Sequence, residues 1–253
     1  MVTVVHNGKE HEIPGMLDEL SPKQYQGYLF LAVMLRRGVI DETGFRAKLL
    51  SLLLELPADI TDYRAEIADR LIAQLGVLDG FFDEKGAITA TGRNLLPEFA
   101  GWKSKVGDML NGMTFGDFIE AINLLGQLDE SDEGQLQVLG ELSRLMYSAP
   151  SEEAEVPMLV AVHSLTLFTS VFNMIRTGPI SISGEDINFS IIFKPVPGVP
   201  SKANDHTGWH GIAMEVASSG VFGPLKEVHS TPLWDVLLYL YRAKFDLLHE
   251  KRK

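Results

Sequence analysis

The sequence contains no cysteine among its 253 residues, which excludes a disulfide framework, a thiol nucleophile and any metal site with thiolate ligands. Basic residues are also few, because 22 Lys and Arg stand against 34 Asp and Glu and give a formal net charge of -12. A protein of this charge would approach a phosphate backbone against its own average electrostatic field. We therefore expect no nucleic acid among its partners.

Motifs typical of common enzymes are missing as well. The chain has no GxxxxGK[ST] phosphate loop, no strand followed by GxGxxG, and no GxSxG nucleophile elbow. The acidic runs at 129–133 and 151–155 lack the ligand pattern and central glycine of an EF-hand loop, so we interpret them as solvated helix ends. The sequence predicts a protein that is not an enzyme and that uses no cofactor.

Charged residues are absent from one segment, 156–175, whose length matches the roughly 20 residues of a membrane-spanning helix. Polar residues interrupt it, and no aromatic belt or second span accompanies it. We interpret it as a central core helix in which His163 is a neutral histidine bonded to a neighbour. Residues 1–15 also lack the basic and apolar regions of a secretion signal. These features predict a cytoplasmic protein without a membrane partner.

Two local patterns organise the first third of the chain. An Asn-Gly pair at 7–8 lies between two short extended runs, which is typical of a β hairpin closed by a type I′ turn at about 2–13. Apolar residues then recur at helical spacing behind three potential capping residues, Ser21, Asp41 and Thr61. The pattern predicts one hairpin followed by three helices.

Less periodic sequence follows before the helical pattern returns. Residues 81–113 have Gly, Thr and Pro in place of a clear period, and we interpret them as a connector with one short strand. Helices are predicted to begin at Thr114, after Ser131 and at Thr231. Two alternating runs about a Ser-Gly turn predict a second hairpin at about 179–193.

Together these elements predict a mainly α fold, a multi-helix globular bundle with two small β hairpins. We divide it into an N-terminal hairpin plus three-helix region at 1–80, the connector at 81–113, and a C-terminal helical region with the inserted hairpin at 114–253. No repeat with a fixed period and no low-complexity tract separates these parts. We therefore expect them to form one continuous fold.

Two histidines are the candidates for metal chemistry. His206 and His210 have the i, i+4 spacing that lets two imidazoles on one helix face share a metal ion. Gly208 lies between them, however, and the Pro-rich and Gly-rich segment 195–211 predicts a loop. Loop histidines without a metal are the favoured interpretation, and a metal-dependent enzyme that uses this pair stays as an alternative.

Aromatic and leucine side chains gather in the last 45 residues. Such a cluster suits either a core or a partner-binding surface, and we expect most of its members to be core. The apolar final helix is nevertheless the segment that we expect to dock on another protein or on a second copy of the chain. The candidate partner-binding residues are Trp209, Phe222, Trp234, Leu238, Tyr241 and Phe245.

Three stretches of the sequence resemble proteins encoded in the tail-gene regions of phages and prophages of Bacteroidetes-type hosts. They are IPGMLDELSPKQYQGYL at 13–29, LPEFAGWKSKVGDMLNGMTFGDFIEA at 96–121 and GWHGIAMEVASSGVFGPLKEVHSTPLWDVLLYLYRAKFD at 208–246. None of them is a motif with a catalytic mechanism attached. Together they cover roughly a third of the chain.

This resemblance implies a tail assembly chaperone-like protein that is mostly helical, acidic and not an enzyme. Such a protein would bind an apolar helical partner, for example a tape measure protein, and keep it from aggregating. The alternative is a structural connector or tail subunit that stays in the virion. The expected location is the cytoplasm of the host cell for the first role and the finished particle for the second.

Overall fold

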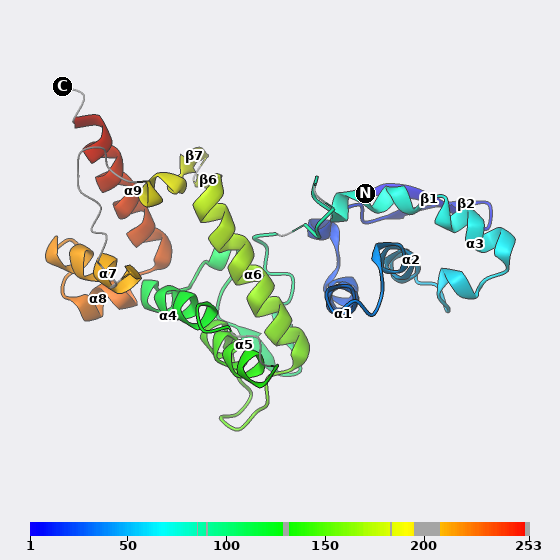
Figure 1. The fold of residues 1–253 in the computed structure, drawn as a ribbon, viewed down its shortest axis with the longest axis horizontal. Coiled ribbons are helices and arrows are strands. Elements are labelled where there is room, and N and C mark those ends of the chain that lie inside the picture. Colours follow the sequence, from blue (N-terminus) through cyan, green and yellow to red (C-terminus); the bar gives the residue numbers. More distant parts are fainter. Residues whose placement is uncertain (85, 90, 129–131, 183, 195–207, 251–253) are drawn as a thin grey trace.

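The chain folds into a mainly α structure with small antiparallel strand pairs, as predicted, in a computed structural model (Figure 1). The structure describes residues 1–84, 86–89, 91–128, 132–182, 184–194 and 208–250. The α-helices in this part are α1 (Pro22–Arg36), α2 (Glu42–Leu53), α3 (Ala65–Ile72), α4 (Phe115–Leu125), α5 (Asp132–Met146), α6 (Met158–Thr177), α7 (Gly208–Ser218), α8 (Leu225–Ser230) and α9 (Leu233–Glu250). The strands are β1 (Val2–His6), β2 (Lys9–Ile13), β3 (Glu98–Phe99), β4 (Trp102–Ser104), β5 (Tyr147–Ser148), β6 (Pro179–Ile182) and β7 (Glu185–Asn188). Short 3-10 helices are η1 (Leu17–Glu19), η2 (Ile60–Asp62), η3 (Leu75–Phe81), η4 (Asp108–Leu110) and η5 (Phe189–Phe193).

The first hairpin forms where the Asn-Gly pair predicts it. Strand β1 pairs with β2 in a register that runs from Val2 opposite Ile13 to His6 opposite Lys9. The turn residue Asn7 has φ 51° and Gly8 has φ 73°, so both have the positive φ that a type I′ turn requires. The prediction of this hairpin is confirmed.

Side-chain caps begin the first two helices. The Ser21 hydroxyl accepts a hydrogen bond from the Gln24 backbone N–H, and the Gln24 side chain accepts from the Ser21 N–H, which completes a capping box before α1. The Asp41 carboxylate accepts from the Gly44 N–H at 2.7 Å and begins α2. Both predicted caps are confirmed.

The predicted third cap is wrong. Thr61 lies inside η2, where its backbone N–H and its hydroxyl both donate to the Asp59 carboxylate. Asp59 thus closes a separate 3-10 turn and uses the hydroxyl that would have capped a helix. Helix α3 begins only at Ala65 and has no side-chain cap.

The connector contains more regular structure than one short strand. Strands β3 and β4 pair with each other, and β4 also pairs with β5 from the end of α5, which gives a small three-stranded antiparallel sheet. A positive φ of 51° at Ala100, followed by Gly101 at 84°, forms the turn between β3 and β4. Sequence reasoning missed this second strand because β3 and β4 are too short to show alternation.

The second hairpin is shorter than predicted. Strands β6 and β7 pair from Pro179 opposite Asn188 to Ile182 opposite Glu185, but 189–193 forms the 3-10 helix η5. Phe189 is fully buried, and the Asn188 side chain accepts from the Ser190 N–H, so the chain leaves the ribbon to enter the core. This burial overrides the alternating pattern of the sequence.

The predicted loop at 195–211 is wrong at its end, because Gly208, Trp209 and His210 form the first turn of α7. Residues 195–207 of this segment, and Ser131 before α5, lie outside the described part of the chain. Thr114 caps α4 as predicted, since its hydroxyl accepts from the Asp117 N–H at 3.1 Å. The last helix, α9, begins two residues after the predicted Thr231.

Buried apolar side chains form two clusters. Figure 1 shows the ribbon as two bodies, one with α1–α3 and the first hairpin and one with α4–α9. The N-terminal cluster is built from residues between 4 and 96, and the C-terminal cluster from residues between 102 and 237. Helix α6 contributes Phe168 and Val171 to the C-terminal cluster, while Leu159 and Val162 near its start pack on the N-terminal one. This helix therefore packs on both clusters.

Helix α6 is also the one described helix that is long and apolar enough to cross a membrane, by length and composition only. Half of its apolar span is buried inside the fold. Its buried residues include His163, Ser164 and Ser170 alongside the apolar ones. The same residues that give the segment its hydropathy thus serve as core contacts, in agreement with the interpretation of 156–175 as a core helix.

Candidate partner-binding surfaces

Most of the C-terminal aromatic residues pack against the C-terminal cluster rather than project from it. The indole N–H of Trp234 donates to the Met109 carbonyl at 2.9 Å, and its ring lies 5.7 Å from that of Phe189. Tyr241 contacts the same Phe189 ring at 5.8 Å between centroids. Trp209, Phe222 and Leu238 are likewise partly buried against this cluster. These side chains stabilise the fold and leave only part of their surface for a partner.

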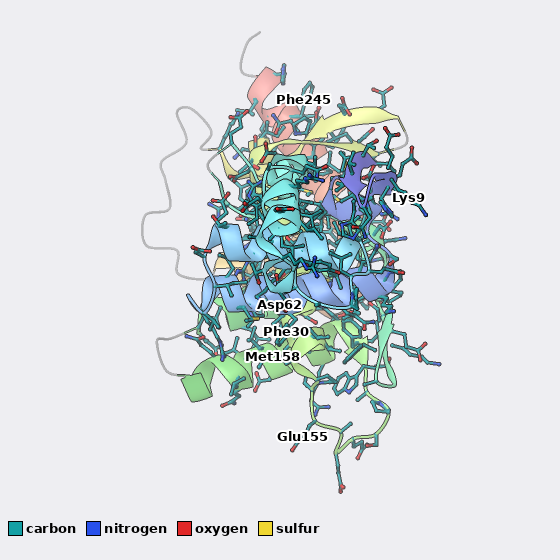
Figure 2. The ribbon with its side chains drawn as sticks, turned by 90° about the vertical axis from the view of Figure 1, so that its right-hand side faces the viewer. Lys9, Phe30, Asp62, Glu155, Met158 and Phe245 are labelled. Carbon is teal, nitrogen blue, oxygen red and sulfur yellow. The ribbon has the colours of Figure 1, made fainter. Side chains whose placement is uncertain are left out.

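Phe245 differs from this group because it lies near the end of α9 with 40% of its surface exposed (Figure 2). Its ring stacks on His249 at 3.9 Å between centroids. Leu247, two positions later in α9, is 49% exposed. The end of α9 is thus the part of the predicted C-terminal surface that is open to a partner.

Of the two histidines considered as metal ligands, only His210 lies in the described part of the chain. His206 lies outside the described part of the chain. The exposed His210 has Nε2 3.4 Å from the amide of Asn123, and its ring lies 6.1 Å from that of His229. These side chains border an open hollow of about 590 Å³ between α4, α7 and α8 that also carries Asp117. Among the described residues, no group of three or more His, Asp or Glu side chains is arranged to hold a metal ion.

His163 is a core residue, as predicted. It is 1% exposed, and both ring nitrogens have partners: the Tyr25 hydroxyl at Nδ1 and the Asn94 side-chain oxygen at Nε2. Burial lowers the pKa of His163 to about 4, so the imidazole is neutral at pH 7. A ring that is enclosed and fully bonded has no position left for a substrate.

An open hollow of the N-terminal body lies between α1 and α2. It has a volume of about 610 Å³ and is lined by Phe30 and Leu31 of α1, by Leu52 of α2, and by Leu56 and Pro57 of the segment after α2. Phe30 borders it with 60% of its surface exposed, and Figure 2 shows its ring on the N-terminal body. An aromatic side chain this exposed beside an apolar hollow is typical of a partner-binding surface.

Close helix packing fixes the floor of this hollow. A Cβ atom at Gly27 would lie 2.6 Å from Cδ2 of Leu52, so the glycine lets α1 approach α2 at this level. At the edge, the Lys48 ammonium lies 2.6 Å from the Asp59 carboxylate, and this ion pair holds the segment after α2 against the helix. The hollow is therefore formed in the absence of any partner.

Sequence reasoning missed Phe30 because it falls outside the helical stripe of α1. That stripe contains the buried residues Tyr25, Tyr28, Leu29 and Ala32, whereas Phe30 lies outside it and is exposed. The available signal was a large aromatic residue in α1 that lies outside the buried stripe of this helix. Such a residue is unnecessary for the core and points to contact with something else.

Comparisons with protein-family models, with curated proteins and with solved structures gave no match.

Proposed function

We propose that this chain is a non-enzymatic assembly protein that binds an apolar helical segment of another protein, in the manner of a phage tail assembly chaperone. The observation that carries the proposal is the preformed apolar hollow between α1 and α2 with the exposed Phe30 at its edge. Three stretches that resemble phage and prophage tail-region proteins support the choice of partner, which would be a tape measure protein.

The physical basis is recognition of a helix in a groove. A helix presents apolar side chains at i, i+3, i+4 and i+7, and these can bury themselves against Phe30, Leu52 and Leu56. Complete burial of one phenylalanine side chain contributes about 1.5–3 kcal/mol. Meanwhile the net charge of -12 would keep the complex soluble while the partner's apolar face is covered.

The test is co-expression with the tape measure protein of the same phage or prophage genome, followed by measurement of how much of that protein stays soluble and co-purifies. Phe30→Ser should reduce co-purification strongly. Val39→Ser is the matched control, because Val39 is 64% exposed and does not line the hollow. Equal co-purification by both variants would contradict binding through this hollow.

A third variant separates the two candidate surfaces. Phe245→Ser removes the exposed aromatic residue at the end of α9 without touching the N-terminal body. If Phe245→Ser abolishes binding while Phe30→Ser does not, the partner docks on α9. The role as a tail subunit makes a different prediction, namely that the chain is recovered from purified particles in a fixed copy number.

A further inference from the structure

A small polar cavity lies inside the junction between α1 and α6, separate from the hollow of the proposed function. It has a volume of about 170 Å³. Three hydroxyl groups around it are buried and have no hydrogen-bond partner within the described structure, namely those of Tyr28, Thr89 and Ser170. Tyr28 is 2% exposed and Ser170 is 3% exposed, so bulk water does not satisfy either group.

Three unpartnered hydroxyls around one cavity require an explanation. Each buried polar group without a partner costs about 1–3 kcal/mol of folding free energy. The apolar substitutes Phe and Ala would avoid this cost at Tyr28 and Ser170, and the fold nevertheless places hydroxyls at both positions. A molecule with oxygen or nitrogen atoms that enters the cavity would satisfy all three groups together.

The charged residues around the cavity indicate the sign of the charge that a bound molecule would carry. Arg36, one of the lining residues, is exposed and takes part in no ion pair within the described part of the chain. Burial raises the pKa of Tyr28 above its ordinary value, and the nearby Arg36 acts in the opposite direction. The described lining of the cavity contains no Asp or Glu. Its local charge is therefore positive, in a chain whose net charge is -12.

An apolar hollow adjoins the polar cavity. It has a volume of about 240 Å³ between α1, α5 and α6, and Val33, Arg36 and Val162 line both spaces. The other apolar side chains around it are Leu136, Leu139, Met158 and Leu165. Leu136 and Met158 are each about half exposed. The polar cavity and the apolar hollow thus adjoin each other at Arg36.

We propose that this junction binds a carboxylate carried on a short aliphatic group, with the carboxylate in the hydroxyl-lined cavity and the aliphatic part in the adjoining hollow. A carboxylate accepts about four hydrogen bonds, and three hydroxyls with one guanidinium supply four donor groups. Its single negative charge matches the single charge of Arg36. Such a ligand is either a free aliphatic acid or the terminal carboxylate of an apolar peptide.

The test is isothermal titration of the full-length protein with hexanoate. Arg36→Gln should weaken hexanoate binding by about tenfold or more, because a charge-assisted hydrogen bond is lost. Arg70→Gln is the matched control, because Arg70 is an exposed arginine of α3 that lines neither the cavity nor the adjoining hollow. Its affinity for hexanoate should stay within about twofold of that of the unaltered protein.

Two further comparisons test the carboxylate and the aliphatic part of the ligand separately. Affinity should rise by about fourfold for each methylene group from acetate to butyrate to hexanoate, and 1-hexanol should bind much more weakly than hexanoate. Ser170→Ala and Tyr28→Phe should each weaken hexanoate binding while the folded protein without ligand stays intact. If N-acetylleucine binds more tightly than hexanoate, the natural ligand is a peptide end; the reverse order indicates a free acid.

The proposal is overturned if hexanoate gives no saturable binding, if Arg36→Gln and Arg70→Gln weaken binding equally, or if 1-hexanol binds as well as hexanoate. The first outcome leaves water as the content of the cavity. None of these outcomes bears on Phe30 and the hollow between α1 and α2, so the proposed function is tested separately.

Discussion

The hydroxyl of Tyr25 lies 2.9 Å from Nδ1 of His163, although 138 positions separate the two residues in the sequence. Nε2 of the same imidazole lies 3.0 Å from Oδ1 of Asn94, whose amide nitrogen donates to Ser104 Oγ and to the Val106 carbonyl. Because the Asn94 nitrogen faces those two acceptors, His163 donates from Nε2 and accepts from Tyr25 at Nδ1. One continuous series of hydrogen bonds therefore links α1, α6 and the connector.

This histidine makes the free energy of unfolding depend on pH. The pKa of His163 is about 4 in the folded protein because burial disfavours the charged ring, whereas the unfolded chain has the ordinary value near 6.5. Between these values the unfolded state binds more protons than the folded state, so stability falls as the pH is lowered from 6.5 to 4. The loss should reach about 3 kcal/mol, and above pH 6.5 His163 should contribute no pH dependence.

Urea unfolding at a series of pH values measures this effect. The control is His163→Gln, which removes the titrating group, so the difference between the two stability curves isolates His163 from every carboxylate. Nitrogen NMR of the imidazole provides an independent reading of the pKa and of the proton at Nε2. A midpoint near 6.5 in the folded protein would contradict the description of an enclosed ring.

Tyr25→Phe should destabilise the protein through the histidine rather than through packing. The ring stays in place beside Tyr28, but Nδ1 of His163 is left without its donor inside the fold. The expected loss is about 1–3 kcal/mol of unfolding free energy. In a double-mutant cycle with His163→Gln the two losses should be clearly non-additive, and simple addition of the two would show that the groups are not coupled.

The features that the sequence predicted well are those determined by neighbouring residues. The turn at Asn7 and Gly8 and the caps at Ser21 and Asp41 depend on atoms within three positions of each other, and all of them form. The cap at Thr61 failed for a local reason too, since Asp59 competes for its hydroxyl.

Long-range contacts account for what the sequence did not predict. Asn94 shows only the local pattern of a turn, with its side-chain oxygen accepting from the Leu96 N–H, and nothing near it in the sequence indicates His163. The hydroxyls of Tyr28 and Ser170 lie on two helices that come together only in the folded chain. Likewise, Phe189 leaves its strand because Trp234 and Tyr241 provide a core position for it.

Trp234 should behave as a core residue in mutagenesis. Trp234→Ala removes the ring contact with Phe189 and the bond to the Met109 carbonyl, and we expect a loss of about 3 kcal/mol or more in unfolding free energy. Trp234→Phe keeps most of the ring and should cost about 1 kcal/mol for the lost hydrogen bond. Chemical denaturation of both variants measures the two values. If Trp234→Ala leaves stability unchanged and lowers only partner binding, the residue is an interface residue instead.

Close packing of α4 against α8 depends on a glycine. A Cβ atom at Gly116 would lie 2.9 Å from the backbone oxygen of His229 and 3.1 Å from its Cβ, and these backbone-linked atoms cannot turn aside. Gly116→Ala should therefore destabilise the protein by about 1–3 kcal/mol, despite the higher helix propensity of alanine.

Gly140 provides the matched control for this substitution. It lies inside α5, and a Cβ atom there would meet nothing within 4 Å, so Gly140→Ala should stabilise the protein by about 0.5–1 kcal/mol. Opposite signs for the two substitutions, measured by chemical denaturation, are the expected result. If both alanines stabilise the protein equally, α4 and α8 are farther apart in solution than described, and the hollow that His210 and His229 border is wider as well.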